Sequence, residues 1–151
     1  MTIARMDNPI AFFILVALFA LWNLDFVSSI FNLKALDPKL PDEFRGIYDE
    51  DKYAKSQEYT RVSERYGIIS ATYSLTILLI FWFSGGFGWL DTWLRGYGWS
   101  ETVTGLAFIG SLVIGNTLLS LPLQVFDTFV TEERFGFNKT TPKTFVIDQF
   151  K

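Results

Sequence analysis

Two residue types are missing from this sequence: its 151 residues include no cysteine and no histidine. Without cysteine there can be no disulfide, thiol nucleophile or thiolate ligand, and without histidine there is no imidazole base or ligand. Carboxylates remain as the candidate acid–base groups. Zinc sites nearly always include nitrogen or sulfur donors, so we expect no metal site and no cofactor held by this chain alone.

A surplus of positive charge is also lacking, because 13 basic residues face 16 acidic ones and the net charge is −3. There is therefore no electrostatic reason to expect nucleic acid as a partner. Hydrophobic residues, in contrast, make up 50% of the chain and aromatic residues 18%. This composition is unusual for a soluble domain and predicts contact with a lipid bilayer.

Three apolar stretches predict an all-α integral membrane protein with three transmembrane helices, at about 10–33, 66–83 and 102–126. In the first, Asn8 and Pro9 suit the cap and the first helical position. Its apolar core, 10–24, covers only about 22 Å of a bilayer core of about 30 Å, so the helix is expected to continue to residue 33. A signal peptide after Arg5 is the competing interpretation, but bulky residues stand where cleavage needs small ones.

The segments between these spans differ in character. Residues 34–65 are charged, with turn residues first and a helical pattern from about Asp51. They form either a solvated helical arm or a docking surface for a partner domain. The glycine cluster at 84–88 ends the second span, and the residues after it predict a short interfacial helix with an apolar face: Leu90, Trp93, Leu94 and Tyr97.

The tail, residues 127–151, begins as a helix leaving the membrane, with Pro122 predicting a kink one turn before the exit. Gly136 stands where a helix ending near Phe135 needs a left-handed residue. Thr141 and Pro142 then suit the start of a new helix. We expect its apolar face to consist of Val146, Ile147 and Phe150.

Asp25 and Asn116 are polar residues within predicted spans, where an ionisable or amide group is a functional hypothesis by default. Conduction of protons or ions is one interpretation. Hydrogen bonding is the simpler one, and for Asp25 the partner is expected to be Ser28 or Ser29.

Glu132 and Glu133 could in principle serve as an acid and a base, but adjacent residues do not face each other on a helix. We expect them instead to bond to Arg134, Lys139 or the turn backbone. No residue of this chain is therefore assigned a catalytic role.

Basic residues concentrate in two of the four segments outside the spans, which predicts that the first loop and the tail are cytosolic and the N-terminus lies outside. Only Arg5 and Arg95 belong to the other two segments. The basic residues of the loop and tail are Lys34, Lys39, Arg45, Lys52, Lys55, Arg61, Arg65, Arg134, Lys139, Lys143 and Lys151.

Several of these stretches resemble the CAAX prenyl protease family, the type I integral-membrane zinc metalloendopeptidases. They are Leu121-Pro122, the run from Phe129 to Lys139, Phe145 to Lys151, and, in the first loop, Leu40 to Phe44 and Tyr53 to Thr60. The resemblance covers essentially the whole chain as the N-terminal part of that family. The turn motif that carries it comprises Glu132, Glu133, Arg134, Phe135, Gly136, Phe137, Asn138 and Lys139.

The resemblance implies that the complete protein is a zinc metalloendopeptidase that cleaves a peptide or protein substrate with a zinc-bound water and a glutamate base. These spans would form part of a membrane chamber and brace a downstream zinc catalytic domain, in the bacterial inner membrane or the endoplasmic reticulum. The family's H-E-x-x-H helix is absent, so this chain alone is expected to be inactive. The alternatives are a small non-enzymatic membrane scaffold or regulator, and a transport subunit that depends on Asp25.

Overall fold

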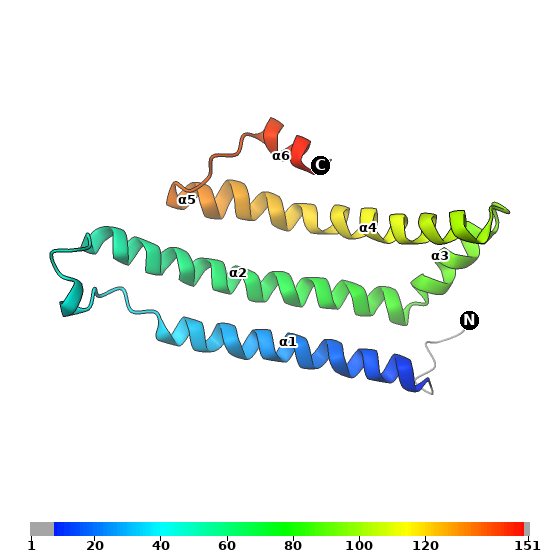
Figure 1. The fold of residues 1–151 in the computed structure, drawn as a ribbon, viewed down its shortest axis with the longest axis horizontal. Coiled ribbons are helices and arrows are strands. Elements are labelled where there is room, and N and C mark those ends of the chain that lie inside the picture. Colours follow the sequence, from blue (N-terminus) through cyan, green and yellow to red (C-terminus); the bar gives the residue numbers. More distant parts are fainter. Residues whose placement is uncertain (1–7, 150–151) are drawn as a thin grey trace.

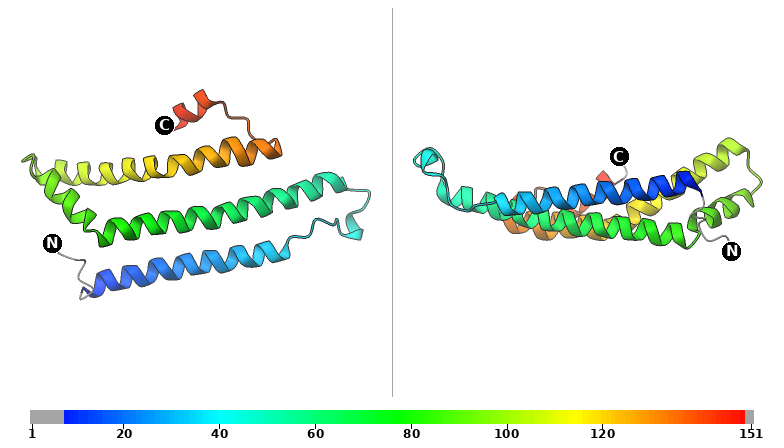
Figure 2. Two further views of the ribbon diagram at one scale, coloured as in Figure 1. Left: turned by 180° about the vertical axis from the view of Figure 1, so that it is seen from behind. Right: turned by 90° about the horizontal axis from the view of Figure 1, so that it is seen from below.

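The computed structural model describes residues 8–149, and it confirms an all-α fold. Three long helices lie side by side in one thin layer, antiparallel in chain order, as Figures 1 and 2 show. They are α1 (Pro9–Ala35), α2 (Glu50–Phe83) and α4 (Glu101–Phe126). Arg5, Phe150 and Lys151, which entered the sequence predictions, lie outside the described residues.

Local capping chemistry explains where the long helices begin. The Asn8 side chain accepts a hydrogen bond from the Ile10 N–H at 2.9 Å, and Pro9 occupies the first helical position, as predicted. Asp49 caps α2 in the same way, accepting from the Lys52 N–H at 3.0 Å. α2 is one continuous helix of 34 residues, so the second half of the predicted loop 34–65 belongs to the same helix as the span.

The layer leaves most apolar side chains uncovered. Three helices are long and apolar enough to cross a membrane, namely Pro9–Ala35, Glu50–Phe83 and the continuous stretch Glu101–Phe135. No residue in the most apolar window of each is buried in the described structure. The helices of a single layer do not cover its faces, and the apolar composition makes lipid the natural contact for these faces. The chain is an integral membrane protein.

α1 and α2 are joined by side-chain hydrogen bonds near the middle and one end of their contact. The Trp22 indole N–H donates to the Thr72 hydroxyl at 3.3 Å, and the Asn32 amide donates to the Glu64 carboxylate at 3.0 Å. Glu58 and Glu64 each stand three residues from Arg61 along α2. The Arg61 guanidinium pairs with Glu58 at 3.2 Å, which leaves Glu64 to bond across the helices.

α2 and α4 are joined by two tyrosines. The Tyr66 hydroxyl donates to the Leu123 carbonyl, and the Tyr73 hydroxyl donates to the Leu119 carbonyl at 3.1 Å. A backbone carbonyl has two lone pairs, so it can accept from a tyrosine as well as from its own helix. These bonds link the helices across the space between them.

α3 (Gly86–Arg95) packs between the ends of α2 and α4. Gly85 starts it with a φ of +81°, which glycine adopts without steric cost. The prediction of a single apolar face is wrong in one respect, because Leu90 and Leu94 are buried while Trp93 and Tyr97 are exposed. α3 therefore has a face toward the protein and a separate aromatic face.

The exposed aromatic face of α3 is a ladder of rings. Trp89 stacks on Trp93 with ring centroids 6.1 Å apart, and Trp93 meets Tyr97 edge to face at 5.5 Å. Beside the ladder, hydrogen bonds from Arg95 to Asp91 and Glu101 raise the pKa of the guanidinium further above its ordinary value. The guanidinium of Arg95 therefore stays charged across the physiological pH range.

The tyrosine bridges generate a testable prediction. We expect Tyr66→Phe and Tyr73→Phe each to lower the free energy of unfolding in detergent by about 0.6 kcal/mol, the average for a hydrogen bond between membrane helices. Tyr97→Phe is the control, because its hydroxyl makes no hydrogen bond within residues 8–149. If all three substitutions changed the thermal unfolding temperature equally, the stabilising role of the Tyr66 and Tyr73 hydrogen bonds would be contradicted.

Candidate functional site

The helix that contains the third predicted span ends at Phe135, in agreement with the predicted end near that residue. Helical structure continues beyond Phe126 as a π-helical segment, Asp127–Glu132, and then as α5 (Glu133–Phe135). Pro122 lies inside α4 and removes one backbone donor, which disturbs the regular hydrogen-bond ladder of the last turns.

The exit turn after α5 forms as predicted around Gly136. This glycine has a φ of +72°, in the left-handed region. The turn folds back on the carbonyl of Glu132, which accepts from the N–H groups of Phe137 at 2.9 Å and Asn138 at 3.3 Å. Both bonds satisfy a carbonyl that the ending helix would otherwise leave unpaired.

The side chains of the exit turn interact differently from the prediction. Glu133 accepts a hydrogen bond from the Asn138 amide at 2.9 Å, and the Asn138 side-chain oxygen accepts from the Thr140 N–H at 2.7 Å. Arg134 lies over the Phe135 ring, with its guanidinium carbon 5.4 Å from the centroid. Asn138, rather than Arg134 or Lys139, is thus the partner of the carboxylate. An Asx-type turn favours this choice.

The exit turn is held against α2 by aromatic contacts. The Tyr59 ring meets Phe135 at 5.4 Å and Phe137 at 4.7 Å between centroids, both edge to face. Phe135 is only 6% exposed. Tyr59 lies in the predicted loop, and its spacing alone gave no indication that it faces the turn. This contact joins the exit turn to α2 at this end of the layer.

α6 (Pro142–Asp148) starts as predicted, with the Thr141 hydroxyl accepting from the Thr144 N–H at 3.2 Å. The predicted apolar face is wrong for Val146 and Ile147, which are exposed. The helix instead contacts the α4 side through Phe145, whose ring lies 5.5 Å from that of Phe129. The amide of Gln149 also donates to the Gln124 side-chain oxygen at 3.1 Å.

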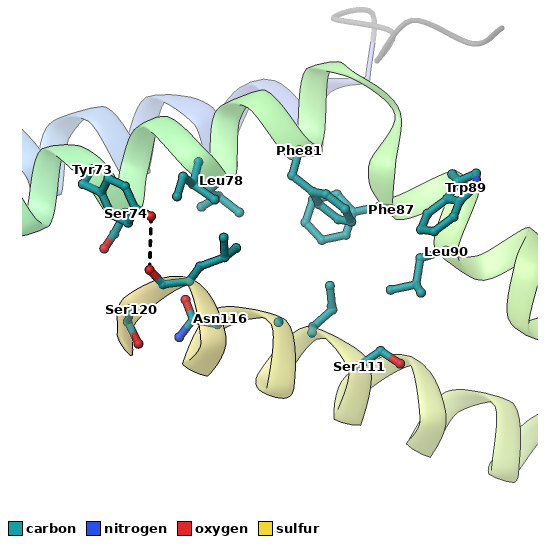
Figure 3. A pocket seen from close by; sticks show the side chains of 14 residues that line it. Tyr73, Ser74, Leu78, Phe81, Phe87, Trp89, Leu90, Ser111, Asn116 and Ser120 are labelled. Atoms are coloured by element: carbon teal, nitrogen blue, oxygen red, sulfur yellow. Dashed lines mark hydrogen bonds between the residues drawn. The ribbon is translucent and has the colours of Figure 1, made fainter. Parts of the chain in front are cut away.

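A groove of about 410 Å³ separates α2 and α4 where α3 holds them apart (Figure 3). Asn116, predicted as an intramembrane polar group, lines it together with Ser111 and Gly115. A Cβ at Gly115 would meet no atom within 4 Å in the described structure, so α2 and α4 are not closely packed at this point. The groove is otherwise mainly apolar, with Phe81, Phe87, Trp89 and Leu90 at one end.

Asp25, the other predicted intramembrane polar residue, lies at the contact of α1 and α2. It borders a crevice of about 30 Å³ with Ser29 and Gly67. The expected hydrogen bond to Ser28 or Ser29 is not formed within residues 8–149. Asp25 and Asn116 therefore face different spaces, and the structure does not bring them together.

The side chains that the structure describes do not form a zinc site. Among residues 8–149, no three carboxylates gather in a way that could hold a metal ion, and the sequence offers no histidine or cysteine.

The chain is similar to known proteins along most of its length. Residues 29–151 match the family model described as CAAX prenyl protease N-terminal, five membrane helices. A probable CAAX prenyl protease 1 of Schizosaccharomyces pombe is 34% identical over 116 residues, which are 68% of this chain and 24% of that protein. CAAX prenyl protease 1 of Saccharomyces cerevisiae is 31% identical over 129 residues, 78% of this chain and 28% of that protein.

The fold agrees with these matches. The crystal structure of S. mikatae Ste24p superposes with a TM-score of 0.82 at 28% identity, and covers 95% of this chain and 35% of that one. The chain thus spans about a quarter to a third of the length of these relatives. With α2, α4, the first loop and the exit turn inside the matched region, this chain belongs to the CAAX prenyl protease N-terminal family.

Proposed function

We propose that this chain is the membrane part, residues 1–151, of a zinc metalloendopeptidase whose zinc-binding residues lie outside it. The observation that carries the proposal is the similarity to S. mikatae Ste24p, which extends over 95% of this chain but only 35% of the other. In this proposal α1, α2 and α4 form part of the wall of a membrane chamber. The peptide substrate and the zinc belong to the complete protein.

The exit turn has a bracing role in this proposal. Its backbone bonds to the Glu132 carbonyl, and its Phe135 and Phe137 rings pack on Tyr59 of α2. These contacts fix the direction in which the chain leaves the membrane. Because a catalytic group must be held within a fraction of an ångström, a rigid exit is useful to a domain that follows.

The orientation is also part of the proposal. The first loop and the exit turn lie at the same end of the layer, as Figure 1 shows. Their basic residues support a cytosolic location for that end by the positive-inside rule. The relatives come from eukaryotes, which supports the endoplasmic reticulum as the membrane.

The central prediction concerns the complete protein. We expect its coding sequence to continue past Lys151 into an H-E-x-x-H helix and a later glutamate ligand. The purified complete protein should cleave a peptide, lose this activity to a zinc chelator and regain it with added zinc, whereas residues 1–151 alone should be inactive. A natural stop codon after Lys151, or chelator-resistant cleavage, would contradict the proposal.

A second prediction tests the brace. We expect Gly136→Ala to lower the free energy of unfolding of the complete protein by about 1–2 kcal/mol, because alanine is strained at a φ of +72°. Gly88→Ala is the matched control: Gly88 lies within α3 and its new Cβ would meet nothing within 4 Å in the described structure. The thermal unfolding temperature and the peptidase activity should both fall in Gly136→Ala but not in Gly88→Ala. An unchanged Gly136→Ala protein would remove the bracing role.

A third prediction tests the orientation. The chain has no cysteine, so Lys52→Cys and Gly96→Cys each introduce a single reactive thiol. In sealed microsomes, an impermeant maleimide should label Lys52→Cys from the cytosolic side and Gly96→Cys only after permeabilisation. The reverse pattern would show that the orientation is inverted.

A further inference from the structure

The loop between α1 and α2 contains a small folded unit, residues 40–48, which we call the knuckle. Leu40 is 4% exposed, and a short 3-10 helix, Asp42–Phe44, follows it. The Tyr48 N–H donates to the Phe44 carbonyl at 3.2 Å, and Arg45 pairs with Asp42 at 2.9 Å. These local bonds hold the knuckle in one conformation before any partner binds, which reduces the entropy cost of docking.

The knuckle exposes three apolar side chains. Phe44 is 43% exposed, Ile47 75% and Tyr48 62%, and the two rings meet edge to face at 5.9 Å. Exposed apolar residues within the spans are explained by lipid, but the knuckle lies in a charged loop. An apolar patch there, rimmed by polar groups, is typical of an interaction site.

The knuckle lies farther along the layer than the exit turn does. The exit turn contacts α2 at Tyr59, nine residues after the helix begins at Glu50. At 1.5 Å per residue, the first turns of α2 therefore extend about 14 Å past that contact. Figure 1 shows the loop at the far end of α2, on the same side as α5.

Charge distinguishes between the possible partners. Residues 36–51 contain six acidic and two basic side chains, which leaves a net charge of −4. Such a segment is repelled by the anionic cytosolic leaflet and by a second copy of itself. The acidic side chains are Asp37, Asp42, Glu43, Asp49, Glu50 and Asp51, and the basic ones are Lys39 and Arg45.

Part of this negative charge is available to a partner. Arg45 already pairs with Asp42, and more weakly with Glu50 at 4.0 Å. Glu43 and Asp51, in contrast, form no ion pair within residues 8–149. The knuckle and the start of α2 thus combine three exposed apolar side chains with carboxylates that have no basic partner within residues 8–149.

We infer that the knuckle docks into an apolar, basic-rimmed surface on the downstream part of the same polypeptide. The inference rests on the proposed function, because it needs the further chain that the relatives have: this chain covers only 24% and 28% of the two yeast proteins. The exit turn lies at the same end of the layer as the knuckle, and α6 follows it back along α4. Docking would cover the exposed apolar side chains of the knuckle and neutralise the charge of Glu43 and Asp51.

The experiment places a photo-crosslinking amino acid at Ile47 in the complete, membrane-embedded protein. We expect crosslinks to Lys- and Arg-containing peptides downstream of residue 151 of the same molecule. The same probe at Ile69, 60% exposed on the spanning part of α2, is the control and should not reach those peptides. Ile47 crosslinks to lipid, to a second copy or to another protein, or no crosslink, would overturn the inference.

Charge reversal provides a second arm. Glu43→Lys combined with Asp51→Lys should reduce the Ile47 crosslink yield at least several-fold, and raising the salt from 0.1 M to 1 M should also reduce it, because the screening length falls from about 10 Å to about 3 Å. Lys52→Glu, which adds acidity at the same place, should retain the yield. An unchanged yield in the double variant would overturn the charge argument.

The two proposals fail separately. If the complete protein proves to be a zinc peptidase but Ile47 crosslinks elsewhere, only the docking is wrong. If Ile47 crosslinks downstream in a protein without a metal motif, the peptidase proposal is wrong and the docking stands.

Discussion

A single layer of three helices cannot enclose a core, because each helix has neighbours on at most two sides. The consequences extend through the structure. The long helices leave most of their apolar surface uncovered, and the few buried apolar residues, such as Leu90, Leu94 and Phe135, lie at the ends of the layer. In a bilayer this arrangement is stable, because lipid tails are as apolar as the side chains that they contact. The hydrophobic effect favours insertion of the helices into the membrane, but it does not determine which helices pack against each other.

Specific contacts must therefore set the spacing of α2 and α4. At one end, α3 inserts Leu90 and Leu94 between them. At the other end, Tyr59 packs on the exit turn, and between these points Tyr66 and Tyr73 reach backbone carbonyls of α4. A groove remains because two long helices held at their ends and bridged by tyrosines need not touch along their length. The same logic explains why a Cβ added at Gly105, Gly110 or Gly115 of α4 would meet no atom within 4 Å in the described structure.

The sequence predicted the features that depend on local chemistry. The caps at Asn8 and Thr141 and the left-handed Gly136 are encoded within a few residues, and they are found where expected. It predicted less well which partner each side chain selects. α6 turns Phe145 inward rather than Ile147, because that choice depends on Phe129 of another element. Periodicity indicates that a helix has an apolar face, but the neighbouring element decides which side is covered.

The proposed function gives the residues of this chain a role through position. The chain contains no histidine or cysteine, and the relatives that it matches are named proteases. Position is worth several kcal/mol to a reaction only when the supporting elements are rigid. In the exit turn and the knuckle, which lie at one end of the layer, local hydrogen bonds supply such rigidity. Rigid units at one end, joined to helices free to adapt to lipid, would suit the proposed role of holding a separate catalytic domain in register.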